Sequence, residues 1–170
     1  SRLTILYGAS GVGKSSVVRA GVAHGLRSRA EAAVREGEAP DIPVVFGDWQ
    51  GEPVGEWTGD TSDQVKRALA ESVAATIGEA PRLESGDSLS TAIRRLAPLL
   101  RVERRVPGLD GQVAVDQGKL LIVLDQFEES FLYPRKHGPG SFAHELAEAV
   151  SDDRLPANFL ISIRDDALSR

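Results

Sequence analysis

Cysteine and methionine are both absent from the 170 residues. Without cysteine the chain can form no disulfide framework and no thiolate metal site. No apolar run approaches the roughly 20 residues that a membrane-spanning helix needs, and the first residues resemble a core strand rather than a signal peptide. We therefore expect a cytoplasmic protein without a membrane partner.

Basic residues are also in the minority, with 20 against 25 acidic ones and a net charge of −5. This balance argues against a surface that binds nucleic acid throughout, so we do not expect nucleic acid as a partner. The length suits one domain with a substantial core, and residues 1–170 are assigned to it. Because position 1 is not methionine and the chain starts on an apolar strand, we expect an incomplete fragment of a larger multidomain protein.

A glycine-rich stretch near the start, Gly8–Ser16, matches the P-loop pattern G-x-x-x-x-G-K-[ST]. The apolar, β-branched run Leu3–Tyr7 before it predicts a buried strand. After it, Val18, Val22 and Leu26 recur every four residues and predict one buried helical face. A glycine loop between a strand and a helix is the setting that this motif requires, so we predict a nucleotide phosphate site.

The residue types of this loop suit a triphosphate. Its glycines let backbone N–H groups approach the phosphates and permit positive φ, and the helix that follows points its positive dipole end at them. Lys14 can reach the β- and γ-phosphates, Ser15 is an expected Mg²⁺ ligand, and Ser16 is placed near the α-phosphate. The predicted cofactor-binding residues are Gly8, Ala9, Ser10, Gly11, Val12, Gly13, Lys14, Ser15 and Ser16.

Three more strands are predicted from the short apolar runs Ile42–Phe46, Leu120–Leu124 and Phe159–Ile163. Leu120–Leu124 is the most hydrophobic run, as a strand buried on both faces of a parallel sheet requires. Helices are predicted to begin at Ser88 and Ser141, and the tail Asp165–Arg170 resembles the start of another.

A further amphipathic helix is predicted to open with a capping box formed by Thr61 and Gln64 and to stop at Gly78. We expect its polar face to be solvated. This face carries Lys66, Arg67 and Glu71.

Two segments leave alternatives open. Residues 101–117 predict an irregular loop with a short hairpin arm at Val113–Val115, and its arginines, Arg101, Arg104 and Arg105, could touch nucleic acid or a partner. Glu103 among them, and the lack of interleaved aromatics, favour a solvated loop. In the loop after Ile42–Phe46, Asp48 or Trp49 could approach the nucleotide, while the simpler interpretation anchors Trp49 to the core.

An acid follows the most hydrophobic strand, which is the Walker B pattern. Asp125 would face the P-loop and orient Mg²⁺, directly or through water. Glu128 and Glu129 lie just beyond, and a carboxylate there can polarise the water that attacks the γ-phosphate. Both could instead simply open a helix, where acids favour the dipole, and the sequence does not choose between them.

Arg164 ends the last predicted strand. A guanidinium there can sense the γ-phosphate or stabilise the transition state, or it can pair with Asp165, Asp166 or another carboxylate. The predicted catalytic residues are Lys14, Asp125, Glu128, Glu129 and Arg164, and the predicted metal ligands are Ser15 and Asp125.

Three segments of the chain resemble the bacterial novel STAND NTPases, a branch of the signal-transduction ATPases with numerous domains. Tyr7–Gly21 is similar to the opening of this family, Leu124–Phe131 to its D-Q-F-E-E-x-F segment, and Ile161–Leu168 to its strand-then-R-x-D segment.

The resemblance implies an α/β fold, a three-layer P-loop NTPase sandwich with a mostly parallel sheet. In its group another strand separates the P-loop strand from the Walker B strand, and a catalytic glutamate is present. It also implies a switch that binds ATP or ADP with Mg²⁺, hydrolyses ATP slowly, and self-oligomerises in the full-length protein. Flanking effector and repeat sensor domains are implied, as is truncation of this chain before the C-terminal parts of the family core.

Two other functions share the same motifs. An AAA-like motor or loader would act on nucleic acid or protein, and a small-molecule kinase would need an acceptor site and an arginine-rich lid. A transporter-type signature is absent. The GTPase motif N-K-x-D is absent too, because the single asparagine, Asn158, lies outside one. The absence of the GTPase motif favours adenine.

Overall fold

The computed structural model describes residues 2–9, 11–49, 60–105, 112–131, 138 and 140–165. Ser10 of the predicted phosphate site, and residues 166–170 of the predicted last helix, lie outside the described residues.

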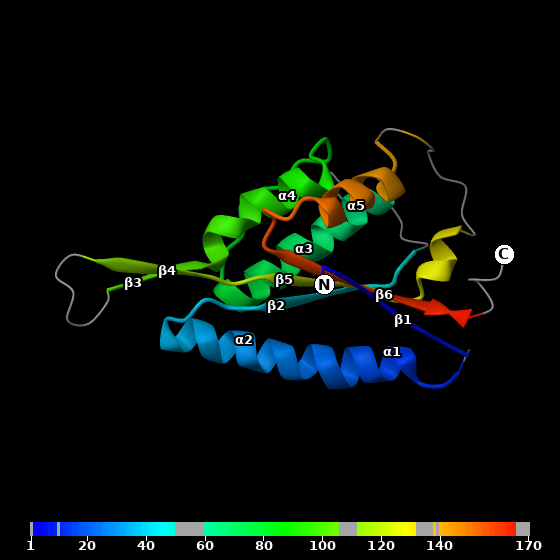
Figure 1. Ribbon diagram of the computed structural model, residues 1–170, viewed down its shortest axis with the longest axis horizontal. Helices are drawn as coiled ribbons and strands as arrows, with labels where there is room; N and C mark the ends of the chain where they lie inside the picture. Colours follow the sequence, from blue (N-terminus) through cyan, green and yellow to red (C-terminus); the bar gives the residue numbers. More distant parts are fainter. Residues whose placement is uncertain are drawn as a thin grey trace.

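Four parallel strands form the central sheet, in the order β1-β6-β5-β2 (Figure 1). The strands are β1 (Leu3–Gly8), β2 (Ile42–Phe46), β5 (Leu120–Leu124) and β6 (Ala157–Arg164). All four apolar runs predicted as strands are confirmed. The prediction that Leu3–Tyr7 is buried is wrong, because β1 lies at the edge of the described sheet and Ile5 and Tyr7 are exposed. β6 separates the P-loop strand β1 from the Walker B strand β5, as the resemblance implied.

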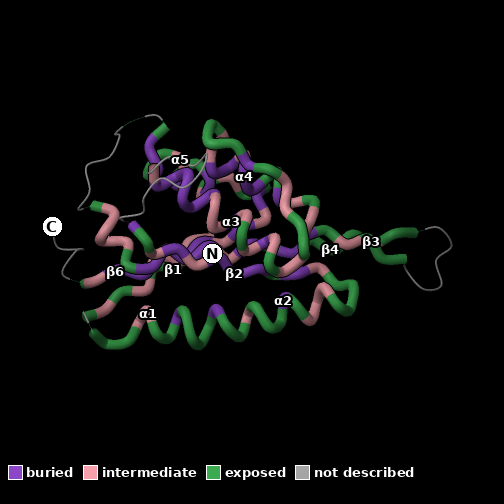
Figure 2. The backbone as a smooth tube through the Cα atoms, turned by 180° about the vertical axis from the view of Figure 1, so that it is seen from behind, coloured by how far each residue is buried: buried purple, intermediate pink, exposed green. Residues whose placement is uncertain are grey.

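Helices cover both faces of the sheet and make a three-layer α/β/α sandwich (Figure 1). One face carries the long first helix, and the other carries α3, α4 and α5. The helical segments are α1 (Lys14–Ser16), η1 (Val17–Ala23), α2 (His24–Glu36), α3 (Thr61–Ile77), α4 (Leu89–Leu96), η2 (Ala97–Leu100), η3 (Phe127–Phe131) and α5 (Phe142–Ser151). The buried residues lie between the layers (Figure 2), and Leu120, Ile122 and Leu124 of β5 are fully buried.

The first helix turns a different face to the sheet than its sequence predicts. Val18 is buried as expected, but the next buried residue is Ala23, and Val22 is exposed. The reason is that Val17–Ala23 forms π-helical turns, in which a residue meets its neighbour five positions on rather than four. The prediction of a four-residue repeat is therefore wrong for Val22.

Two predictions for α3 are wrong. Its N-cap is Asp60, whose side chain accepts from the backbone N–H of Ser62 at 3.0 Å. The N-cap therefore lies one residue before Thr61, the N-cap that the capping box predicts. Lys66 is not solvated but 1% exposed, because Asp63 and the backbone carbonyls of Ser85 and Asp87 surround its ammonium group. Gly78 ends the helix as predicted, in a left-handed conformation.

Residues predicted as an irregular loop form an antiparallel hairpin of β3 (Arg101–Arg105) and β4 (Val113–Gln117). Arg104 pairs with Asp116 across it at 3.0 Å. The hairpin arm predicted at Val113–Val115 is confirmed, although it is longer than expected. It projects from the end of the molecule opposite the P-loop, and its described residues are mostly exposed (Figure 2).

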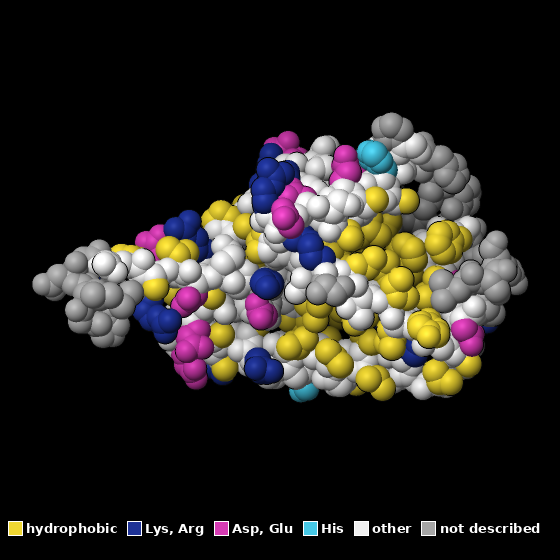
Figure 3. Space-filling view, in the orientation of Figure 1, with side chains coloured by type: hydrophobic (Ala, Val, Ile, Leu, Met, Phe, Trp, Pro, Cys, Tyr) yellow, Lys and Arg dark blue, Asp and Glu magenta, His cyan; other side chains and the backbone are white. Residues whose placement is uncertain are grey.

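β1 lies at one edge of the sheet as far as the described residues go. Apolar side chains gather over this side of the molecule (Figure 3). Ile5 and Tyr7 of β1, and Val17 and Val22 of η1, are large apolar residues that are exposed. Among the described helices, none combines the length and apolar character needed to cross a bilayer.

Candidate functional site

The glycine loop joins the end of β1 to the first residue of α1, at the edge where the parallel strands end. Gly11 and Gly13 have φ of 77° and 84°, in the left-handed region that a Cβ disfavours. Gly8 does not share this conformation, because it still belongs to β1 and is in register with Arg164 of β6. Of the three glycines that permit positive φ, Gly11 and Gly13 adopt it and Gly8 does not.

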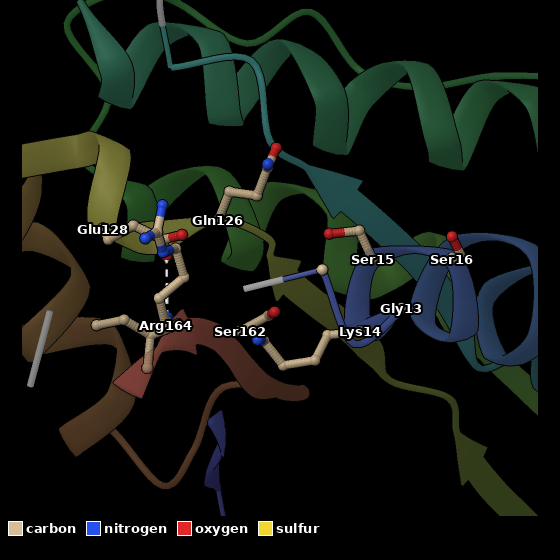
Figure 4. A pocket seen from close by; sticks show the side chains of 10 residues that line it. Gly13, Lys14, Ser15, Ser16, Gln126, Glu128, Ser162 and Arg164 are labelled. Atoms are coloured by element: carbon tan, nitrogen blue, oxygen red, sulfur yellow. Dashed lines mark hydrogen bonds between the residues drawn. The ribbon is translucent and has the colours of Figure 1, made fainter. Parts of the chain in front are cut away.

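A cleft of about 310 Å³ opens beside the loop (Figure 4). The P-loop lines it with Gly11, Gly13, Lys14, Ser15 and Ser16. The segment after β5 adds Gln126 and Glu128, and β6 adds Ser162, Ile163 and Arg164. Gly8, Ala9 and Val12 were predicted to bind the cofactor but are not among the lining residues, and the Val12 side chain is exposed.

Lys14 holds its ammonium group over the loop. Its Nζ donates to the backbone oxygen of Gly8 at 2.5 Å and to that of Ala9 at 2.8 Å. Because the ammonium group is ionised, these bonds are already charge-assisted, and a phosphate oxygen that replaced the carbonyl acceptors would add the attraction between opposite full charges.

Asp125 is fully buried at the end of β5. Its N–H donates to the carbonyl oxygen of Phe46 at 2.8 Å, which continues the pairing of β5 with β2. Its own carbonyl oxygen accepts from Trp49 Nε1 at 2.7 Å. The Oδ1 atom accepts from the Ser15 hydroxyl at 3.0 Å. The two predicted metal ligands, 110 residues apart in sequence, are thus in direct contact.

These two side chains suit magnesium. Mg²⁺ prefers hard oxygen donors and is usually held by one or two protein groups, with phosphate oxygens and water completing the shell. Ser15 and Asp125 supply a hydroxyl and a carboxylate at one point. No cluster of three or more His, Cys, Asp or Glu able to hold a metal occurs in the part of the chain that the structure describes. The Ser15 hydroxyl and the Asp125 carboxylate therefore fit a magnesium ion whose other ligands are nucleotide phosphate oxygens and water.

Glu128 and Glu129 differ in position. Both lie on the short 3₁₀ helix η3, but only Glu128 is among the residues that line the cleft. Glu128 Oε2 accepts from the backbone N–H of Arg164 at 3.3 Å. Figure 4 shows Glu128 and Arg164 together, on the side of the cleft away from Ser15 and Ser16.

Three residues near the cleft were not predicted from the sequence. Ser162 of β6 lines the cleft and is a buried hydroxyl within the otherwise apolar run Phe159–Ile163, which is the signal that could have found it. Gln126 lines the cleft with φ 54°, a strained value for a residue with a side chain. Arg19 lies four residues after Ser15 on the first helix, and its Nε contacts Asp125 Oδ2 at 3.0 Å.

Trp49 anchors its loop to the core, the simpler of the two interpretations. It is buried, and its ring packs edge-on against Phe46, Phe127 and Phe142. Asp48 is exposed and lines a neighbouring hollow beside Arg19.

A parallel sheet with β6 between β1 and β5, a glycine loop after β1, and Ser15 touching Asp125 define a P-loop NTPase fold. The chain belongs to the family described as Novel STAND NTPase 1, whose profile matches residues 1–170. The resemblance drawn from the three sequence segments is thus confirmed, and the chain is a nucleotide-binding NTPase module. The roles assigned to single residues stay predictions.

The fold is similar to that of the Aeropyrum pernix ORC2 protein, solved as ADPNP–ADP complexes. The TM-score is 0.49 and the sequence identity 14%. The similarity covers 99% of this chain and 37% of that one, so the chain spans little more than a third of that protein. No curated protein matches it in sequence.

Proposed function

We propose that this chain is the ATP- and Mg²⁺-binding core of a regulatory NTPase, which hydrolyses the β–γ bond of ATP and acts as a nucleotide-dependent switch in signalling or defence. One observation carries the proposal. The cleft places Lys14 and Ser15 of the P-loop opposite Glu128 and Arg164, which come from two other segments of the chain (Figure 4).

Binding is assigned to the P-loop side. The backbone N–H groups around Gly11 and Gly13, with the N-terminus of the first helix, would hold the phosphates, and Lys14 would neutralise the β- and γ-phosphates. Ser15 and Asp125 would hold magnesium, which when bound neutralises charge on the phosphate oxygens.

Glu128 is the better candidate for the general base. Its position in the cleft wall supports this role, whereas Glu129 lies outside the lining. A base must reach the proton it abstracts, directly or through one water molecule. Glu128 would orient and deprotonate the attacking water.

Arg164 is proposed as the γ-phosphate sensor. It ends β6, between the P-loop strand and the Walker B strand, and its backbone N–H already contacts Glu128. A phosphate group would compete with carboxylates for its guanidinium. A γ-phosphate in the cleft would therefore change the positions of the Arg164 and Glu128 side chains. Such a difference between the ATP-bound and ADP-bound states is required of a nucleotide-dependent switch.

Adenine as the base, self-oligomerisation, and flanking effector and sensor domains are part of this proposal. They rest on the family and on the absence of a guanine-specifying motif from the sequence.

The test uses the full-length protein. We expect slow release of inorganic phosphate from ATP, and a larger mass by light scattering with a non-hydrolysable ATP analogue than with ADP. Lys14→Ala should abolish both effects. Transfer of the phosphate to a small-molecule acceptor, or the same mass with the ATP analogue and with ADP, would contradict the switch.

A further inference from the structure

The Asp125 carboxylate carries a charge that the fold must neutralise. Its side chain is 0% exposed. An ionised carboxylate cannot stay buried without a partner, because the desolvation cost far exceeds what packing returns. Hydrogen bonds from Ser15 and from the Gln126 N–H, at 3.0 and 3.1 Å, reach Oδ1 but supply no full positive charge.

Arg19 supplies that charge. Its Nε donates to Asp125 Oδ2 at 3.0 Å, whereas Ser15 and the Gln126 N–H donate to Oδ1. Arg19 lies four residues after Ser15, so one helical segment brings both partners to the same carboxylate. The ion pair therefore joins the first helix to the end of β5.

The guanidinium rests on Gly47. A Cβ at this position would lie 2.3 Å from Arg19 Nη2 and 3.4 Å from Asp125 Cβ, so any other residue there would displace Arg19. The Arg19 side chain is also 50% exposed, and it lines an open hollow with Asp48 and Gln126. The guanidinium therefore packs against Gly47 on one side and faces an open hollow, into which it can move, on the other.

The metal site makes this pair consequential. Ser15 and Asp125 are too few to hold magnesium without phosphate oxygens, so the ion comes and goes with the nucleotide. A bound magnesium ion and the Arg19 guanidinium would both be cations beside the same Asp125 carboxylate.

We propose that Arg19 neutralises the Asp125 carboxylate while no metal is bound. Arg19 thereby also sets the Mg²⁺ concentration at which the nucleotide complex is half-saturated. This inference rests on the proposed nucleotide and magnesium site. Arg19 acts through Asp125, as a positioning residue, and it lowers magnesium affinity because like charges near one carboxylate repel.

The experiment measures binding of a fluorescent ADP analogue while Mg²⁺ is titrated. Removing one positive charge beside the carboxylate should strengthen magnesium binding. For Arg19→Ala we expect the half-saturating Mg²⁺ concentration to fall on the order of tenfold, the size of a change of about 1.4 kcal/mol. In EDTA the same variant should bind ADP more weakly and melt at a lower temperature than the wild type, because Asp125 is then buried without a cation.

Three further variants separate charge from packing. Gly47→Ala keeps the arginine but displaces its guanidinium, so it should change the Mg²⁺ requirement in the same direction as Arg19→Ala. Arg19→Lys restores a charge and should return the requirement toward the wild-type value. Arg29→Ala removes the same charge from an exposed position further along the first helix and should leave the requirement within about twofold.

The outcomes are distinguishable. If wild-type ADP binding does not depend on Mg²⁺, the proposed metal site fails. If it does depend on Mg²⁺, and Arg19→Ala needs as much magnesium or more, the counter-charge proposal is overturned. The same holds if Arg29→Ala lowers the requirement as far as Arg19→Ala does.

Discussion

The indole N–H of Trp49 donates to the backbone carbonyl oxygen of Asp125, with 2.7 Å between Nε1 and the oxygen. This bond ties the loop after β2 to the residue that ends β5, 76 positions further along the chain. Both partners are buried, so water cannot replace the donor. The tip of the Walker B strand is thereby fixed from the side away from the P-loop.

Trp49→Phe keeps an aromatic ring but removes this donor. We expect the free energy of unfolding to fall by about 1–3 kcal/mol, because the Asp125 carbonyl oxygen loses its buried partner. Urea denaturation measures the loss. An unchanged midpoint would show that the hydrogen bond contributes nothing to stability.

Lys14→Ala should abolish binding of ATP and ADP, since no other lysine lines the cleft in the part of the chain that the structure describes. Isothermal titration calorimetry checks the result. Lys119→Ala is the matched control, because Lys119 is exposed and precedes β5, at the opposite edge of the sheet. Normal ATP affinity in a folded Lys14→Ala variant would contradict the assignment.

Glu128→Gln should retain ATP binding and slow hydrolysis about 10²–10⁴-fold in the full-length protein, the range for loss of a general base. Glu129→Gln, one residue further along the same short helix, is the control and should hydrolyse ATP at nearly the wild-type rate. Single-turnover phosphate release measures both variants. Equal rates in Glu128→Gln and the wild type would place the base elsewhere.

Lys66→Met should lower the free energy of unfolding by about 3–5 kcal/mol, because it leaves Asp63 charged and buried without its cation. Arg67→Met is the matched control at the next position. Arg67 pairs with the exposed Glu71 at 3.5 Å, and such pairs contribute about 0–1 kcal/mol. Chemical denaturation of the two variants should therefore give clearly different midpoints, and similar ones would contradict the burial of Lys66.

Side-chain hydrogen bonds from Arg154 hold the pKa of Asp152 well below its usual range, helped by the Arg154 N–H and by Arg94 and opposed by partial burial. Because the folded pKa is depressed, the contribution to stability is fully present above the unfolded value of about 3.9 and is lost as pH falls below it.

Asp152→Asn should therefore lower the melting temperature slightly at pH 6, with the difference from the wild type shrinking toward pH 2. Melting curves at several pH values measure this. Asp153→Asn removes the same charge from the neighbouring exposed residue and should show no such pattern. A constant difference across the pH range would contradict the ion pair.

Strand positions were predictable because a buried parallel strand must be continuously apolar. Ile42–Phe46 and Leu120–Leu124 fall on the observed strands with the expected bounds. The contact between Ser15 and Asp125 followed as well, since parallel strands end at a common edge of the sheet. The strand order confirms the fold class, and the profile match over residues 1–170 confirms the family.

The remainder depended on contacts that no local pattern encodes. Lys66 is buried because Asp63 and two loop carbonyls surround it, although its position in the helix repeat resembles a solvated face. β3 has no apolar face to reveal it, since its five residues are three arginines, one glutamate and a single valine. Arg19 could be associated with Asp125 only after the first helix had been placed against the end of β5.

The π-helical turns of η1 also bear on how the chain tolerates changes in length. Val18 and Ala23 are five positions apart yet face the same layer, whereas an α-helix returns to one face after about 3.6 residues. The segment therefore holds one residue more than a regular helix covering the same span. Deleting Val22, whose side chain is exposed, would restore ordinary spacing and leave α2 seated on the sheet. We therefore expect deletion of Val22 to lower the melting temperature less than deletion of a residue from the regular helix α2.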